Sequence, residues 1–184
     1  MRIDSHQHFW RYDEEEFDWI SDDMHRLKQD FLPKHLAKEF EKNNVQGCMT
    51  VQARQTKIET RWLLELADKN PMILGVVGWI DLCADDLEQQ LSEFENQPKL
   101  KGFRHVIQAE ASGYMLKPAF IRGVSLIAEK GYSFDLLIHS KQLCEVCELV
   151  KILPRMKLVI DHIAKPNIAS REWEDWHTYI AELA

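Results

Sequence analysis

Short apolar runs rich in β-branched residues recur along the chain and alternate with longer segments of helical periodicity. In one such segment, Leu63, Leu66 and Ala67 have the spacing that buries one face of a helix. The predicted strands are Ile3–His8, Gly47–Val51, Ile73–Ile80, Gly102–Gln108, Ser133–His139 and Lys157–Ile160. The predicted helices are Pro33–Asn43, Ile58–Asn70, Asp85–Asn96, Pro118–Lys130 and Gln142–Leu153, with a last helix near Ala184.

This alternation predicts an α/β fold with a parallel sheet, because each helical segment has about the length of a crossover between parallel strands. Nearly continuous apolar strands suit a sheet that is covered on both faces. Two architectures fit, a doubly wound open sheet and a (β/α) barrel. The first strand ends in His6-Gln7-His8, and no glycine-rich phosphate loop follows it. We therefore predict a TIM-type (β/α)8 barrel, with residues 1–184 in a single domain.

The length of the chain conflicts with a complete barrel. Eight βα units typically need about 250 residues, and about 200 is near the lower end. The 184 residues hold about six units, so we expect the last units to be missing and two sheet edges to be open. The stretch Phe9–Phe31, rich in Trp, Asp and Glu, is predicted to be a long loop over the barrel mouth that acts as a lid.

Composition excludes several classes of function. The net charge of −7 argues against a nucleic-acid partner. No uncharged apolar segment approaches the roughly 20 residues that cross a bilayer, and the start at Met1 lacks the apolar stretch of a signal peptide. Four cysteines do not suggest a disulfide framework, so we expect a cytoplasmic protein with reduced thiols. Cys144 and Cys147 form a Cys-x-x-Cys pair inside a helical pattern, which indicates packing rather than redox chemistry.

Two histidines close the first predicted strand. His6 and His8 are two positions apart, so both imidazoles project to the same side and can hold one ion or one substrate oxygen together. Asp4 shares that side and is a candidate to orient an imidazole. The alternative is a pair of polar residues on a solvent-facing turn, because two histidines alone do not make a metal site.

Other polar residues stand at the ends of later predicted strands. His162 follows the apolar run Leu158–Ile160, at the rim where barrel active sites lie, and His139 ends the fifth predicted strand. Arg104 and His105 are neighbours on the fourth, so at most one of them points into the barrel. An inward arginine suits a carboxylate or a carbonyl, whereas an outward one would pair with a helix carboxylate. Location alone makes three further residues candidate substrate contacts: Gln52, Arg54 and Trp79.

Several motifs together resemble the amidohydrolase-related (amidohydrolase 2) family, in particular its sugar lactonases. The similarity runs in order along nearly the whole chain. The motifs are Ile3-Asp4-Ser5-His6-Gln7-His8-Phe9-Trp10, Phe31-Leu32-Pro33, Val51-Gln52-Ala53, Glu59-Thr60-Arg61-Trp62-Leu63-Leu64, Gly75-Val76-Val77-Gly78-Trp79-Ile80-Asp81-Leu82, Lys101-Gly102-Phe103-Arg104-His105, Phe134-Asp135-Leu136-Leu137 and Asp161-His162-Ile163-Ala164-Lys165-Pro166.

The resemblance implies a (β/α)8 barrel that opens sugar-acid lactones by attack of water on the carbonyl. It implies His6, His8 and His162 as metal ligands, with one divalent ion, zinc by expectation, that not every member requires. His162 and Arg104 would act in catalysis, and Gln52, Arg54, Trp79, His105 and His139 would contact the lactone. The general base would be an aspartate at the end of strand 8, which has no counterpart in residues 1–184, so we expect impaired turnover.

Two other functions stay open at this point. One is a catalytically inactive binding or assembly protein descended from such an enzyme, which would pair its open edges with another chain or with a second copy. The other is a decarboxylase of the same superfamily.

Overall fold

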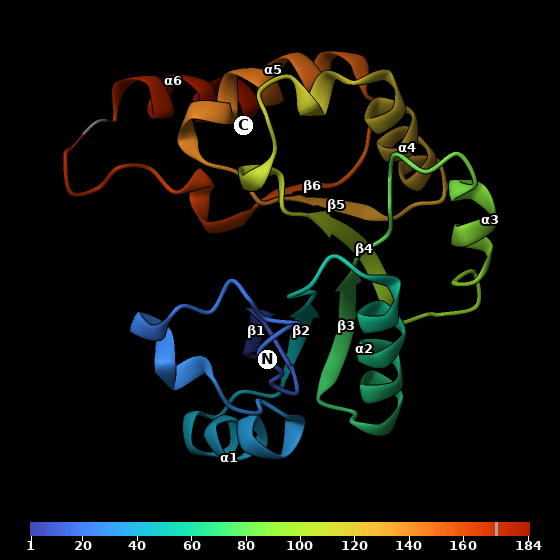
Figure 1. Ribbon diagram of the computed structural model, residues 1–184, viewed down its shortest axis with the longest axis vertical. Coiled ribbons are helices and arrows are strands. Elements are labelled where there is room, and N and C mark those ends of the chain that lie inside the picture. The colour runs from blue at the N-terminus through green and yellow to red at the C-terminus, as the bar shows by residue number, and fades with distance from the viewer. Residues whose placement is uncertain (172) are drawn as a thin grey trace. The chain divides into compact units, whose positions relative to one another are not determined.

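The computed structural model describes residues 1–171 and 173–184 (Figure 1). Its strands follow the order β1 to β6 in one sheet, and the pairs β1–β2, β2–β3, β4–β5 and β5–β6 are parallel. The predicted α/β fold with parallel strands is thereby confirmed. The strands are β1 (Ile3–Gln7), β2 (Gly47–Val51), β3 (Ile73–Gly78), β4 (Leu100–His105), β5 (Ser133–Leu136) and β6 (Leu158–Ile160).

The chain forms two compact units. The first comprises Met1–Trp79 with Asn96–Lys101, and the second Ile80–Glu95 with Gly102–Ala184. The strand β4 begins in the first unit and continues in the second. The single domain predicted over residues 1–184 stays a prediction.

In the first unit, two helices accompany β1 to β3. They are α1 (Pro33–Asn43) and α2 (Lys57–Lys69). Helix α2 begins at the cap Thr56, whose hydroxyl accepts a hydrogen bond from the amide of Ile58 at 3.3 Å. Its fully buried face, with Leu63 and Ala67, packs beside β3 (Figure 1). Burial of this apolar face is the main source of stability for a helix of this length.

The segment Phe9–Phe31 is a long loop with a packed interior. The backbone amide of Trp10 donates to the carbonyl of Phe31, and the amide of Phe31 donates to the carbonyl of Trp10, both at 2.9 Å. These two bonds join the ends of the segment in an antiparallel bridge. Inside it, Trp10, Phe17 and Ile20 form a buried hydrophobic cluster, and a 3₁₀ turn, η1 (Asp22–Leu27), follows. No α-helix and no strand beyond a single bridge lies in this segment, which agrees with the predicted long loop, and its aromatic residues bury one another. Its action as a lid stays a prediction.

In the second unit, α3 (Leu87–Ser92), α4 (Pro118–Glu129), α5 (Leu143–Ile152) and α6 (Glu174–Leu183) accompany β5, β6 and most of β4. The core contains Phe103, Phe120 and Phe134, with the rings of Phe120 and Phe134 5.8 Å apart. Gly123 of α4 lies so close to the preceding segment that a Cβ there would be 2.0 Å from the carbonyl oxygen of Leu82. Only glycine fits at this approach.

The predicted strand ends were too late in this unit. Strand β4 ends at His105 rather than Gln108, and β5 ends at Leu136 rather than His139. The reason is tertiary, since β6 is three residues long and its last paired residue, Ile160, lies opposite Leu136. Beyond Leu136, β5 has no partner in β6, and the chain continues as a loop.

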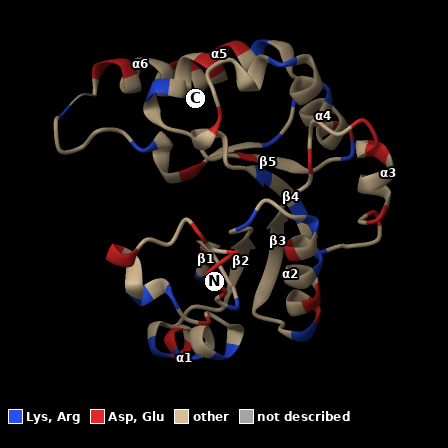
Figure 2. Ribbon diagram, in the orientation of Figure 1, with Lys and Arg blue, Asp and Glu red and all other residues tan. Residues whose placement is uncertain are grey.

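Charged side chains of both signs are interspersed on α1, α2 and α5 (Figure 2). No helix among the described residues is long and apolar enough to cross a membrane. The four cysteines are free thiols, and burial raises the pKa of Cys48 to about 11.

Candidate functional site

His6 and His8 converge at the end of β1 in the first unit. Their Nε2 atoms are 3.3 Å apart, and their rings meet edge to face. The Nδ1 atom of His8 is 2.8 Å from the carbonyl oxygen of Val51. Because a carbonyl only accepts, His8 donates from Nδ1 and its Nε2 keeps a lone pair in the neutral ring.

This spacing suits a shared metal ion. In a tetrahedral zinc site with Zn–N bonds of about 2.0–2.1 Å, two ligand nitrogens lie about 3.3–3.4 Å apart. The group that orients the ring of His8 is thus the Val51 carbonyl, which accepts from Nδ1 and which the sequence did not indicate. Asp4 accepts from the backbone amide of His6 at 3.2 Å, and its predicted part in orienting an imidazole stays a prediction.

Gln52 and Trp79, two of the predicted substrate contacts, also lie in the first unit. Gln52 is fully buried and its amide bonds to the carbonyl of Val77 at 2.8 Å. The backbone of Trp79 is fixed by the hydroxyl of Thr60, which bonds to both its amide and its carbonyl at 2.8 Å. The backbone at the ends of β2 and β3 is therefore held firmly where these residues stand.

Arg54, the third of these residues, faces the segment Phe9–Phe31. Its guanidinium forms an ion pair with Glu16 and lies 5.3 Å from the centre of the Phe17 ring. Buried Glu59 accepts from the amides of Ala53 and Arg54 at 3.0 and 2.8 Å. Arg54 thus links the end of β2 to the folded segment, and its contact with substrate stays a prediction.

In the second unit, Arg104 and Asp161 form a buried ion pair. Arg104 Nη1 is 3.0 Å from Asp161 Oδ2, and their side chains are 4% and 1% exposed. Arg104 lies opposite Asp135 in the register of β4 and β5, so strand alternation puts Arg104, Asp135 and Asp161 on the same side of the sheet. The partner of Arg104 is thus a carboxylate at the end of β6, not one on a helix.

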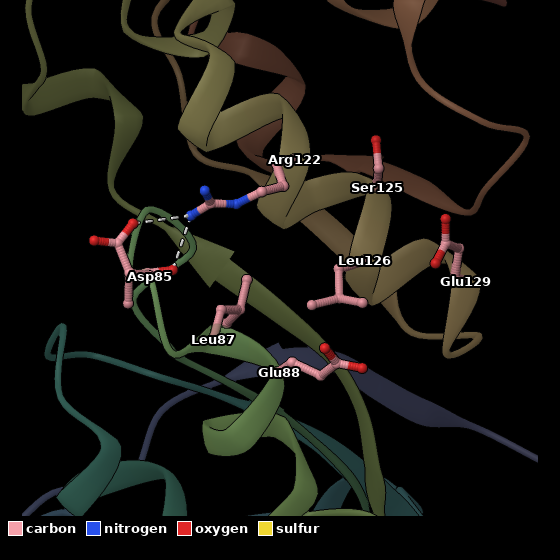
Figure 3. A pocket seen from close by; sticks show the side chains of 8 residues that line it. Asp85, Leu87, Glu88, Arg122, Ser125, Leu126 and Glu129 are labelled. Carbon is pink, nitrogen blue, oxygen red and sulfur yellow. Dashed lines mark hydrogen bonds and ion pairs between the residues drawn. The ribbon is translucent and has the colours of Figure 1, made fainter.

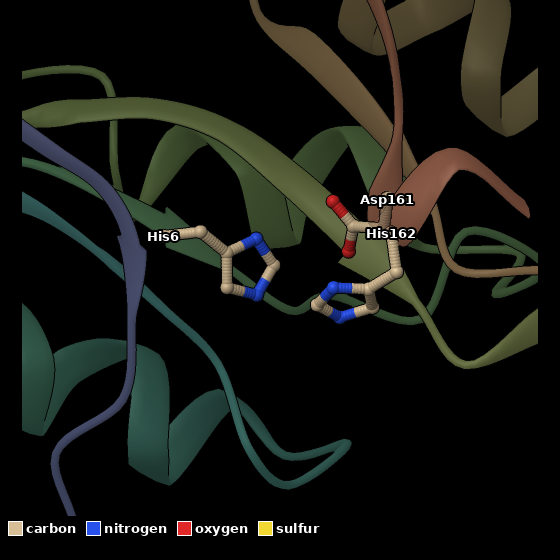
Figure 4. A group of neighbouring side chains, drawn as sticks. All are labelled: His6, Asp161 and His162. Atoms are coloured by element: carbon tan, nitrogen blue, oxygen red, sulfur yellow. The ribbon is translucent and has the colours of Figure 1, made fainter. Parts of the chain in front are cut away.

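After β6 the chain passes through a left-handed turn that begins at Asp161 and His162. Figure 4 draws these two residues together with His6 of β1. Residues 162–165 all have positive φ angles, from 48° to 58°, although none is glycine. Such a conformation costs about 1–2 kcal/mol per residue. The turn is held by the Asp161–Arg104 pair and by the indole of Trp176, which donates to the Ile163 carbonyl at 2.7 Å.

Lys165 ends this turn and reaches back over the ends of the strands. Its ammonium donates to Oε1 of Gln108, in the turn η2 (Ile107–Ala109) that follows β4. Partial desolvation and then the charge of Arg104 lower the pKa of Lys165. Desolvation, followed by the charges of Lys165 and Lys141, also lowers the pKa of half-buried His139. Lys165, Gln108 and His139 therefore lie together at the ends of β4 to β6.

His105 points to the opposite side of the sheet from Arg104. Its ring stacks on Tyr114, with centroids 5.2 Å apart, and its Nε2 is 2.9 Å from Glu110. Burial raises the pKa of Tyr114, with a smaller contribution from its hydrogen bond with Cys83. These contacts place His105 in the layer between sheet and helices, and its predicted contact with substrate stays a prediction.

A surface hollow of about 360 Å³ in the second unit contains none of the predicted site residues (Figure 3). It lies between the start of α3 and α4. Arg122 there bonds to the carbonyl of Ala84 at 2.9 Å and pairs with Asp85 at 3.8 Å. The arginine thus fastens α4 to the preceding loop.

The profile of a protein family described as Amidohydrolase matches residues 3–184, and the chain belongs to this family. The family assignment made from the motifs is thereby confirmed. Among its relatives, an L-fucono-1,5-lactonase of Burkholderia multivorans is 37% identical over the whole chain, and one of Burkholderia ambifaria is 32% identical. The chain spans 64% of the length of each. An L-rhamnono-gamma-lactonase of Scheffersomyces stipitis is 29% identical over 67% of the chain and 38% of its own length.

A solved structure is similar along the whole chain. It is a crystal structure of an amidohydrolase from Burkholderia multivorans with bound zinc, with a TM-score of 0.94 and 37% identity. The match covers 100% of this chain and 66% of that one, which agrees with about six of eight βα units and confirms the predicted fold class.

Sequence reasoning missed two residues at the ends of β4 and β6. Gln108 was taken as the end of a strand, and Lys165 only as part of the motif Asp161–Pro166. A signal was present in the motif Asp161–Pro166, where a lysine follows a candidate ligand within the same short loop.

Proposed function

We propose that this chain carries the first part of the active site of a lactone hydrolase that opens a sugar-acid lactone. The observation that carries the proposal is the His6–His8 pair, whose Nε2 atoms are 3.3 Å apart while the Val51 carbonyl fixes the ring of His8. The similarity to two L-fucono-1,5-lactonases supports the substrate class, a six-membered lactone of a deoxy sugar acid.

The donors fit one divalent ion, and zinc is the metal of the similar solved structure. We propose His6, His8 and His162 as its ligands. When bound, such an ion polarises a carbonyl and lowers the pKa of water. In the reaction the oxygen of water bonds to the carbonyl carbon, the ring C–O bond breaks, and the ring oxygen takes up a proton to leave a hydroxy acid.

The residues of the chain prepare this step by position. The proposed part of His162 depends on the left-handed turn, which Asp161 ties to Arg104. The buried ion pair supports a positioning role for Arg104, and its predicted polarisation of the carbonyl stays a prediction. Gln52, Trp79 and His139 are proposed to contact the lactone. Asp161 is engaged by Arg104, and we propose an aspartate outside residues 1–184 as the general base.

Zinc binding followed by calorimetry tests the histidine pair. We expect one zinc per chain, and His8→Asn to weaken binding at least about tenfold, as a lost ligand or its supporting contact does. His177→Asn is the matched control, since this exposed histidine on α6 lies outside the proposed site. Equal zinc affinity of the wild type and His8→Asn would remove the metal site from the proposal.

Substrate class is tested separately, by following acid release from L-fucono-1,5-lactone and other aldonolactones and carbon dioxide release from aromatic carboxylic acids, together with ligand-observed NMR. Specific turnover or binding of sugar lactones or their acids supports the proposal. Decarboxylation of an aromatic acid would replace it with the decarboxylase alternative, and binding to none of them would favour an assembly protein.

A further inference from the structure

The turn after β6 presents two functional groups. His162 begins the left-handed stretch and Lys165 ends it, and both residues are exposed in this chain. A run of four non-glycine residues in this conformation persists only where the surroundings hold it, and such strain clusters at functional sites. His162 already has a proposed role as a metal ligand, whereas Lys165, at the other end of the turn, has none so far.

Lys165 contributes little to holding the fold. Among the described residues, the ammonium of Lys165 has one hydrogen-bond partner, Gln108. The loop that carries Gln108 is already fixed without the lysine, because Gln142 donates to the Ile107 carbonyl at 3.0 Å and the Gln108 amide bonds to the Leu137 carbonyl at 2.9 Å. An ammonium group has three donors, and Gln108 takes one of them.

The charge of Lys165 is not compensated by a close carboxylate. In the described part of the chain no carboxylate oxygen lies within 4.0 Å of its ammonium, whereas Arg104 is paired with Asp161 at 3.0 Å. Positive groups lie close together there. Burial and then the charge of Arg104 lower the pKa of Lys165, and burial and then the charge of Lys165 lower the pKa of His139. An anion would be stabilised at this position.

We propose that Lys165, oriented by Gln108, binds the carboxylate of the ring-opened sugar acid. The proposal rests on the function proposed above for the identity of the acid. The ammonium would donate to a carboxylate oxygen of the product, the atom group that was the lactone carbonyl before water attacked it. This makes Lys165 a product-contacting residue that distinguishes the acid from neutral polyols of the same stereochemistry.

The test compares L-fuconate with L-fucitol, which has the same hydroxyl groups along its chain but no carboxylate. Calorimetry on the full chain measures both ligands with the wild type, Lys165→Met, Lys165→Arg and Lys141→Met. Lys141 is the matched control, an exposed lysine that also acts on His139 but has no bond to Gln108. We expect Lys165→Met to weaken L-fuconate binding about 10- to 100-fold, the effect of one charge-assisted hydrogen bond.

The supporting result also requires that Lys165→Arg keep most of the affinity, that Lys141→Met change little, and that L-fucitol bind the wild type and Lys165→Met alike. In the wild type, the side-chain NMR signal of the Lys165 ammonium shifts with L-fuconate and not with L-fucitol, a readout that needs no variant to fold. Unchanged L-fuconate affinity in Lys165→Met, or equal loss for both ligands, would overturn the proposal.

Its failure is distinct from failure of the proposed function. Binding of L-fuconate that ignores Lys165 leaves the lactonase proposal intact. Lysine-dependent binding of D-gluconate or acetate, without L-fuconate, keeps the carboxylate site and removes the sugar. A wild type that binds no carboxylate overturns the inference itself.

Discussion

Replacing Arg104 by methionine tests the buried ion pair that holds the end of β6. Methionine replaces the unbranched stem of the arginine but leaves the carboxylate of Asp161, 1% exposed, without its guanidinium, and Asp135 lies in register with Arg104 on the next strand. Removing one member of a buried ion pair typically costs about 3–5 kcal/mol, because the remaining charge is left desolvated. Against a total stability of about 5–15 kcal/mol for a folded domain, this is a large fraction.

The measurement is the free energy of unfolding from urea titrations followed by circular dichroism. The matched control is Lys151→Met, whose ion pair with Glu148 has a similar N–O distance of 2.8 Å but partners that are 56% and 59% exposed. An exposed pair of this kind contributes about 0–1 kcal/mol. If Arg104→Met costs no more than Lys151→Met, burial does not set the strength of the Arg104–Asp161 pair, and its part in holding the turn is refuted.

Three further predictions follow from single residues. The exposed thiol of Cys144 should react with a thiol reagent at mildly alkaline pH much faster than buried Cys48, whose pKa is raised to about 11, and equal rates in the folded protein would contradict the burial of Cys48. The pKa of His139 is lowered below 6.5 in the folded state, so this residue contributes stability above pH 6.5 that is lost as the pH falls through the folded pKa. His139→Asn should reduce the slope of the free energy of unfolding against pH, measured by urea titrations. An unchanged slope would count against the lowered pKa of His139. Ile163→Gly should stabilise the chain by about 1 kcal/mol, since glycine adopts positive φ freely and the isoleucine is 55% exposed; Ile168→Gly, at 63% exposure and without positive φ, should not, and a destabilised Ile163→Gly variant would argue against strain in the turn.

Much of the fold was predictable because its signals are local. Pro33 at the first position of α1 and Asn44 in the left-handed conformation just after its end mark that helix, and its bounds agree with the prediction. The bounds of β2 agree as well. The ends of β4 and β5 were not predictable, since they depend on where the short strand β6 stops. The internal packing of Phe9–Phe31 was hidden for a similar reason, because aromatic residues in an irregular stretch do not show which partners they bury.

The candidate site was predictable as far as strand alternation reaches. Spacing alone put His6 and His8 on the same side of β1, and their Nε2 atoms do converge. The partner of Arg104 lies 57 residues away on another strand, which no local pattern indicates. The left-handed turn was hidden more deeply, since isoleucine, alanine and lysine disfavour positive φ and only the tertiary bonds of the turn hold it.

The closure of Phe9–Phe31 by the Trp10–Phe31 bridge has a consequence for how this part of the chain can vary. Because the two ends are joined to each other, the backbone leaves β1 and enters α1 at positions that do not depend on what lies between them. Each doubling in length of a flexible closed loop costs only about 0.6 kcal/mol. Insertions at the exposed turn 13–16 therefore cost little folding free energy, and they leave β1 in place. Natural variation or grafting can therefore change the length and sequence of this segment while His6 and His8 keep their positions at the end of β1.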